Sequence, residues 1–239
     1  MGGCCERQVI KGEDFVMKVF NSFKINEFDY SSVADILIKN SSIENENKLT
    51  LDLTINNFLQ LTEENFFDSN ETTSKFRKFQ IFFFTTLYEN YSKDTYGLIF
   101  SLFSLVKNEK TKYIYFFQLL KRINTSEITF EMLLSYLEKF LQINLLGYSG
   151  YISNYNFGAE HEDSKSYVKN LIDSVYNPQN IKHFLEKVVD EFNKKILNGG
   201  NKSEHVMTEE EMKLIFEDNK YFFDFYNLRS YFISIYGQI

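Results

Sequence analysis

Only one proline, Pro178, occurs in the 239 residues, and this scarcity narrows the range of possible folds. Turns in many-stranded and loop-rich proteins commonly use proline, so a fold of that kind is not expected here. Instead, apolar residues recur at the three- and four-residue intervals that place them on one face of a helix. The clearest case follows Asn177 and ends at Gly199, with apolar residues at Ile181, Phe184, Leu185, Val188, Val189, Phe192, Ile196 and Leu197. We therefore predict an all-α fold, a bundle of many helices.

The same spacing predicts helices along most of the chain. Thr208 and Glu211 have the spacing of a capping box before a further helix, and the aromatic pattern continues into YFFDFYNLRSYF. Segment 40–57 differs, because the alternation in KLTLDLT fits either one short strand or an extended loop before a helix at 55–61. The other predicted helices cover 14–23, 31–40, 74–92, 96–106, 113–123, 129–143 and 166–176.

Two polar segments, 63–73 and 147–164, interrupt the helical pattern and are predicted to be linkers. The second separates a predicted N-terminal helical lobe, 13–146, from a C-terminal lobe, 165–239, and a flexible segment, 1–12, precedes both. The sequence is compatible with one shared core and with two lobes, because a chain of this length is long enough to form one large hydrophobic core or two smaller ones.

Composition argues against several functional classes. The net charge is −7 and no long basic run occurs, so nucleic acid is not an expected partner. No stretch approaches the roughly 20 apolar residues that span a bilayer. Glycine-rich phosphate loops, G-x-S-x-G and H-E-x-x-H motifs are absent from the sequence. We therefore expect no enzyme, no catalytic residue, no cofactor and no metal.

Both cysteines of the chain, Cys4 and Cys5, lie in the opening MGGCC. Adjacent cysteines form a poor intramolecular disulfide, and no histidine lies at a spacing that would complete a recognisable zinc site. Removal of Met1 would expose Gly2, the acceptor for N-myristoylation, and the two thiols could carry palmitoyl chains. We predict lipidation at Gly2, Cys4 and Cys5, which would make the chain a peripheral protein on the cytoplasmic face of a membrane.

More than one acyl chain is needed for stable anchoring. A single myristoyl chain attaches a protein only reversibly, with a constant of order 10⁴ M⁻¹, so a second chain or a basic patch must supplement it. Glu6 departs from the serine or threonine that the myristoylation pattern usually has at this position. The nearby sequence also lacks a strong basic patch, because acidic residues offset the basic ones: Glu6, Glu13 and Asp14 against Arg7, Lys11 and Lys18.

Two segments have the layout helix, twelve-residue connection, helix. The connections are 107–118 (KNEKTKYIYFFQ) and 200–211 (GNKSEHVMTEEE), with Ile114 and Met207 at their eighth positions. This layout resembles the EF-hand, in which the eighth residue pairs with the partner loop, the ninth often caps the next helix and the twelfth is glutamate. Together with MGGCC, this layout makes the chain resemble the acylated calcium sensors, such as the neuronal calcium sensor and calcineurin-B-like proteins. The resemblance is that of a distant, degenerate relative.

The two connections depart from functional calcium loops. Calcium takes six to eight oxygen ligands, supplied in an EF-hand by acidic or amide side chains, and position six is glycine. Lysines stand at ligand positions in both connections, so the resemblance implies pseudo-EF-hand loops that do not bind calcium. The residues at the compared ligand positions are Lys107, Glu109, Thr111 and Gln118 in the first loop and Gly200, Lys202, Glu204 and Glu211 in the second.

Three functions are compatible with these features. The preferred hypothesis is a non-enzymatic adaptor or scaffold, held at a membrane by acyl chains, that binds a protein partner in an apolar groove. The alternative is a structural subunit of a large ciliary, cytoskeletal or organellar assembly, in which some of the abundant aromatic residues would be buried against neighbouring subunits. A calcium sensor is the third possibility, and the lysines at ligand positions argue against it.

Overall fold

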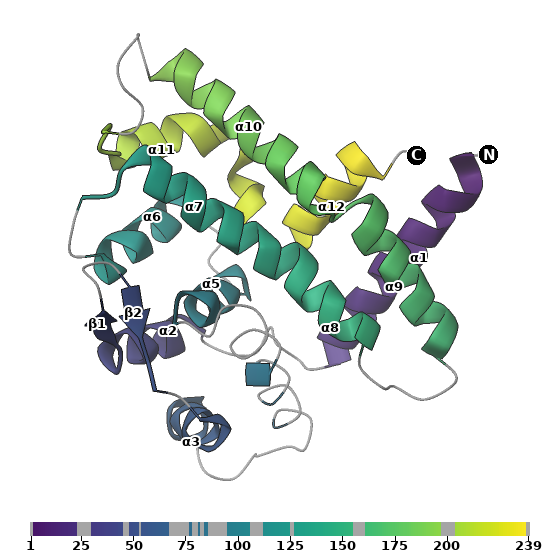
Figure 1. Ribbon diagram of the computed structural model, residues 1–239, viewed down its shortest axis with the longest axis horizontal. Coiled ribbons are helices and arrows are strands. Elements are labelled where there is room, and N and C mark those ends of the chain that lie inside the picture. Colours follow the sequence, from purple (N-terminus) through teal and green to yellow (C-terminus); the bar gives the residue numbers. More distant parts are fainter. Residues whose placement is uncertain are drawn as a thin grey trace.

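The computed structural model describes residues 2–22, 30–44, 48–52, 54–66, 77, 81, 84–85, 95–105, 112–124, 127–154, 161–196 and 204–237. Helices dominate the described chain and pack into a multi-helix bundle, which confirms the predicted all-α fold class (Figure 1). The helices are α1 (Gly2–Ser22), α2 (Tyr30–Lys39), α3 (Ile55–Phe66), α5 (Thr95–Leu105), α6 (Lys112–Ile123), α7 (Phe130–Leu141), α8 (Tyr148–Asn154), α9 (Glu162–Ser174), α10 (Pro178–Lys195), α11 (Glu209–Phe216) and α12 (Phe225–Tyr236). A π-helical segment, η3 (Gln142–Gly147), and a 3₁₀ segment, η5 (Glu217–Phe223), join some of them.

Segment 40–57 forms a small hairpin followed by a helix. Strands β1 (Ser42–Glu44) and β2 (Lys48–Thr50) pair antiparallel, with Ile43 opposite Leu49. The structure thus has a strand in the KLT part of the alternating pattern and a second, unpredicted strand before it. The predicted helix at 55–61 is confirmed, and it continues to Phe66, into the predicted linker 63–73. Most of the predicted helix 74–92 lies outside the described residues.

Helix boundaries follow local capping signals. Asn177 caps α10 by accepting a hydrogen bond from the Asn180 N–H at 2.9 Å, and Pro178 occupies the first turn, where its missing N–H costs nothing. The predicted capping box of α11 is confirmed, because the Thr208 hydroxyl accepts from the Glu211 N–H and the Glu211 carboxylate accepts from the Thr208 N–H. These two helix starts are therefore encoded by the residues at the starts themselves.

We expect Thr208→Ala to lower the free energy of unfolding by about 1 kcal/mol, because it leaves the Glu211 N–H without its side-chain acceptor. The hydroxyl accepts that bond at 3.2 Å at an exposed helix start, so little apolar burial is lost with it. Urea unfolding measures the difference. Thr208→Ser keeps the oxygen and should retain most of the stability; an equal loss in both variants would contradict this account of the cap.

The core is built around helix α5, which is buried along its whole length from Thr95 to Leu105. A helix that is apolar all round is stable only where other elements cover every face. Aromatic rings from four elements meet beside it, with centroids 5.0–6.3 Å apart: Phe103 of α5, Phe116 of α6, Phe140 of α7 and Phe223 of η5. Phe140 and Phe223 come from opposite sides of the predicted lobe boundary and belong to the same apolar cluster.

The predicted linker 147–164 is helical in its first half. Helices α7 and α8 and the π-helical segment between them form one long rod from Phe130 to Asn154 (Figure 1). The polar composition of the segment indicated a linker here, but Gly147, Ser149 and Ser153 are buried, where their small size permits close packing against neighbouring helices. Helix α9 then begins at Glu162, four residues before the predicted start, and the intervening residues 155–160 lie outside the described part.

Candidate functional site

The predicted lipidation residues Gly2, Cys4 and Cys5 lie in the first turn of helix α1. Helix α1 begins at Gly2, within the segment 1–12 that was predicted to be flexible. Sequence periodicity pointed only to 14–23, whereas packing against the bundle extends the helix toward the N-terminus and buries Val9. No helix in the described part of the chain is long and apolar enough to cross a bilayer.

Helix α1 packs against α9 with the two chains running in opposite directions, and their ribbons cross in the view of Figure 1. Gln8 contacts Asn170 near one end of the pair, and the Phe15 ring contacts the His161 ring near the other. The backbones approach each other closely at Gly12, where an added Cβ would lie 2.5 Å from the Tyr167 carbonyl oxygen. Only glycine fits at this point without moving one helix away from the other.

A buried ion pair joins α1 to the far end of the chain. Glu13 of α1 is 8% exposed, and Arg229 of α12 is completely buried. The guanidinium binds the carboxylate through two hydrogen bonds, from Nε to Oε1 at 2.7 Å and from Nη2 to Oε2 at 2.8 Å. This bidentate geometry is the strong form of an arginine–carboxylate pair.

Neighbouring groups satisfy the remaining hydrogen-bonding atoms of the pair. The Arg229 Nη1 donates to the Asn144 carbonyl oxygen at 2.8 Å, and Nη2 also donates to the Ser149 hydroxyl at 2.8 Å. The Tyr176 hydroxyl donates to Glu13 Oε2 at 3.0 Å, and its ring lies 4.7 Å from the guanidinium carbon. The network therefore connects α1, η3, α8, α12 and the segment between α9 and α10.

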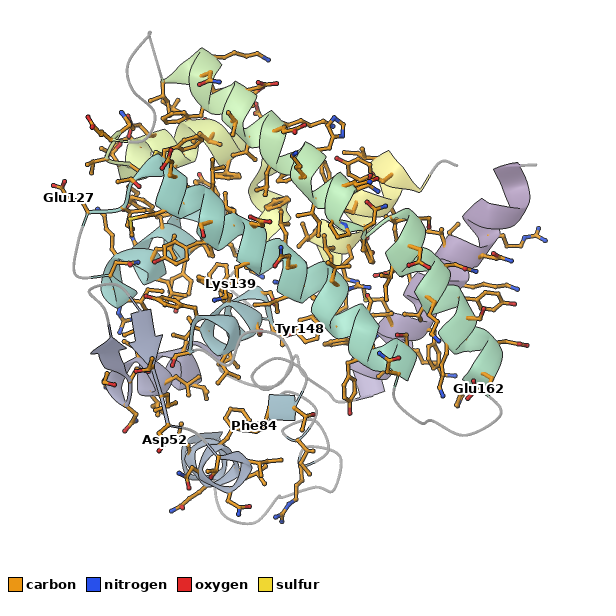
Figure 2. The ribbon with its side chains drawn as sticks, in the orientation of Figure 1. Asp52, Phe84, Glu127, Lys139, Tyr148 and Glu162 are labelled. Carbon is orange, nitrogen blue, oxygen red and sulfur yellow. The ribbon has the colours of Figure 1, made fainter. Side chains whose placement is uncertain are left out.

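The protonation states of the network fit a structural role. Burial raises the pKa of Tyr176 well above its ordinary value, so the hydroxyl keeps the proton that it donates to Glu13. Burial is the largest single effect on the pKa of Arg229 and acts to lower it, but the Glu13 carboxylate and the nearby Tyr176 and Tyr148 together outweigh burial, so the pKa is raised. Burial also raises the pKa of Tyr148, whose side chain lies inside the molecule in Figure 2. Arg229 and both tyrosines thus keep their protons at neutral pH, which favours stabilisation over proton transfer.

The first predicted pseudo-EF-hand loop is not a twelve-residue loop. Helix α6 begins at Lys112, so Gln118 lies within a helix, where its amide nitrogen is 3.4 Å from a Glu209 carboxylate oxygen. Apolar residues that face the core, among them Tyr113 and Phe116, already lie within the predicted connection 107–118, so the second helix begins before that connection would end. Lys107, Glu109 and Thr111 lie outside the described residues.

The second predicted loop keeps part of the expected layout. Thr208 caps α11 and Glu211 lies in the first turn, as the ninth and twelfth positions predicted. Glu204 is exposed, and Gly200 and Lys202 lie outside the described residues.

Backbone pairing joins this loop to the segment before α7. The Met207 N–H donates to the Ile128 carbonyl oxygen at 2.8 Å, and the Phe130 N–H donates to the His205 carbonyl oxygen at 3.0 Å. The eighth residue, Met207, therefore makes a backbone pairing, as predicted. Its partner is the segment before α7 and not the connection 107–118.

The Glu211 carboxylate is already engaged by protein groups. One oxygen accepts from the Thr208 N–H at 2.8 Å, and the other lies 2.8 Å from His205 Nε2. The contact with His205 was not predicted, because no local rule relates residues six apart across a helix start. Within the described chain, no group of three or more His, Cys, Asp or Glu side chains is arranged to hold a metal ion.

An open groove of about 220 Å³ lies between α10, α11, η5 and α12. Buried or half-buried apolar residues form its floor: Phe184, Val188, Ile215, Phe216 and Tyr231. Charged residues line it as well, namely Lys187, Glu191, Lys195 and Asp218. Leu214 of α11 is 47% exposed, and its carbonyl oxygen accepts from Lys195 Nζ at 2.9 Å. The groove thus combines apolar surface with charges of both signs.

The resemblance to acylated EF-hand proteins rests on residues of this chain alone. It depends on the predicted acyl acceptors at the start of α1 and on the layout of Thr208 and Glu211 at the start of α11. The pairing partner of the second loop differs from the expected one. No protein-family model matches the chain, and no match to it was found among the curated proteins or the solved structures.

Proposed function

We propose that the protein is a non-enzymatic adaptor, held at the cytoplasmic face of a membrane by acyl chains on Gly2, Cys4 and Cys5, that presents its helical body to a protein partner. The observation that carries this proposal is the attachment of α1. Its first turn contains the three predicted acceptors, and the same helix is tied to the bundle through Glu13 and Arg229. An acyl chain on this helix would hold the body close to the bilayer in one orientation.

The lipid arithmetic supports two kinds of acylation. A myristoyl chain alone gives only reversible attachment, whereas each further acyl chain adds about 0.8 kcal/mol per buried CH₂. Two palmitoyl chains would therefore convert a transient contact into a lasting one. The proposal requires Met1 to be the initiator residue, since myristoylation needs a free Gly2 amine.

The partner site that fits best is the groove beside α10 and α11. An amphipathic helix of a partner could place apolar residues on Phe184 and Phe216 and charged residues beside Lys187 and Asp218. Calcium is not part of the proposal, because lysines stand at ligand positions and the Glu211 carboxylate is occupied by Thr208 and His205.

The anchor is tested by cell fractionation of the wild-type chain beside Gly2→Ala/Cys4→Ser/Cys5→Ser. We expect the wild type in the membrane fraction, with acyl mass on its N-terminal peptide, and at least a roughly tenfold loss of membrane-bound protein in the variant. Gly3→Ala keeps all three acceptors and should behave as the wild type.

Two outcomes would contradict the proposal. Unmodified Gly2, Cys4 and Cys5 in the native protein would remove the basis for acyl anchoring. A variant that stays in a particulate fraction of high mass would instead favour the structural subunit, whereas an adaptor should be released as a small soluble species.

A further inference from the structure

The charged side chains of helix α1 are distributed between its buried and exposed faces in a way that the sequence alone does not reveal. Along the chain, Glu13 and Asp14 offset the basic residues near them. In the structure the Glu13 carboxylate points into the bundle and is bound by the buried guanidinium of Arg229 at 2.7 Å. Its charge is neutralised inside the molecule, so it no longer offsets the basic residues on the outside.

The outer face of α1 between Arg7 and Lys18 is consequently basic. Arg7, Lys11 and Lys18 are exposed, and Asp14 is the one exposed acidic residue described in this stretch. Positions 7, 11, 14 and 18 follow the four- and three-residue steps that align side chains on one helix face. The face carries a net charge of +2 in a chain whose net charge is −7.

An exposed apolar residue lies next to these charges. Ile10 is 47% exposed, although most large apolar residues of α1 beyond it, such as Val16 and Phe20, are buried. A helix in the plane of a bilayer interface buries apolar side chains at the headgroup boundary, while lysine and arginine keep their charges among the phosphates. Ile10 between Arg7 and Lys11 has this arrangement.

We propose that this face of α1, defined by Arg7, Ile10, Lys11 and Lys18, lies against an anionic phospholipid surface. The inference rests on the proposed membrane anchoring and specifies the lipid class and the side of the protein that meets it. Each basic residue near an anionic leaflet contributes to binding, and the contribution disappears beyond a Debye length of about 10 Å. The predicted acyl acceptors at the start of the same helix would keep Arg7 within that distance. Lys18 lies about 20 Å farther along α1 than Cys5, so the proposal requires the helix to lie along the membrane plane.

The test uses the full chain produced without acylation, so that electrostatic binding is measured apart from the anchor. Co-sedimentation with vesicles of phosphatidylcholine alone is compared with that of vesicles containing phosphatidylserine. We expect binding only to the anionic vesicles, weakening as salt is added. Arg7→Gln/Lys11→Gln/Lys18→Gln should reduce the affinity by about 100-fold.

A matched control removes the same number of charges elsewhere. Lys182, Lys194 and Lys213 are exposed on α10 and α11, so Lys182→Gln/Lys194→Gln/Lys213→Gln should leave vesicle binding unchanged. Equal losses in both triple variants, equal binding to neutral vesicles, or no binding to either vesicle would overturn the inference; the last would point to an acidic protein as the ligand of this face.

Failure of this inference can be distinguished from failure of the proposed function. Native protein that lacks acyl chains but binds anionic vesicles through Arg7, Lys11 and Lys18 would refute the acyl anchor and support the lipid-facing surface. Acylated protein whose unmodified form ignores phosphatidylserine would support the anchor and refute the surface.

Discussion

Arg229→Met will lower the free energy of unfolding by about 3–5 kcal/mol, because it leaves the Glu13 carboxylate buried without its counter-ion. The substitution keeps much of the side-chain volume, so the loss reports mainly on the charge and its hydrogen bonds. The Asn144 carbonyl and the Ser149 hydroxyl also lose the donor that now reaches each of them at 2.8 Å. For a chain of this size each kcal/mol shifts the melting temperature by roughly 2–4 °C, so calorimetry should show a clear decrease.

The matched control is the exposed ion pair between Arg122 and Asp35. Its atoms are also 2.7 Å apart, but the Arg122 side chain is 49% exposed. Solvent screens such a pair, so Arg122→Met should change stability by no more than about 1 kcal/mol. Similar losses in the two variants would show that burial of Arg229 contributes nothing beyond an ordinary surface contact.

A double variant separates the cost of an unpaired charge from the worth of the pair. Glu13→Met/Arg229→Met removes both charges, so it should be more stable than Arg229→Met alone, since no buried carboxylate then lacks a counter-ion. Additive losses would mean that the two residues act independently, against the bidentate contact that the structure places between them.

Local signals were sufficient to predict much of the helical framework. Helix α10 was predicted from its apolar stripe, with Asn177 and Pro178 at its start. Both the stripe and the cap depend only on residues that are close together in the sequence. The capping box at Thr208 was predicted for the same reason. These features depend on neighbours along the chain and need no knowledge of the tertiary structure.

The candidate site depends on contacts between distant residues, and these could not be predicted. Glu13 and Arg229 are 216 residues apart, and nothing near either one indicates its partner. Without knowledge of that pairing, Glu13 was taken for a surface residue whose negative charge offsets the charge of a nearby basic residue. The contacts of α1 with distant elements, among them those of Gln8 and Val9, could not be predicted from the local pattern either.

Two glycines that look alike in the sequence should respond in opposite ways to alanine. Both Gly12 and Gly150 lie inside helices, where replacing glycine by alanine ordinarily gains about 1 kcal/mol through helix propensity. At Gly150 nothing lies within 4 Å of an added Cβ, so we expect Gly150→Ala to be stabilising. At Gly12 the new methyl group would lie 2.5 Å from the Tyr167 carbonyl oxygen, which is backbone and has no rotamer by which to move away.

Gly12→Ala should therefore force α1 away from α9 and destabilise the protein by about 1–3 kcal/mol despite the gain in propensity. Moving α1 outward also lengthens the bonds between Glu13 and Arg229, since Glu13 is the next residue along the helix. Denaturant unfolding of both variants measures the two signs, and hydrogen exchange should show weaker protection of α1 in Gly12→Ala alone. If both alanine variants are more stable than the wild type, α1 cannot lie against α9 as closely as the contact between Gly12 and Tyr167 indicates. A membrane bound at the start of α1 would then not hold the helical body in a fixed orientation.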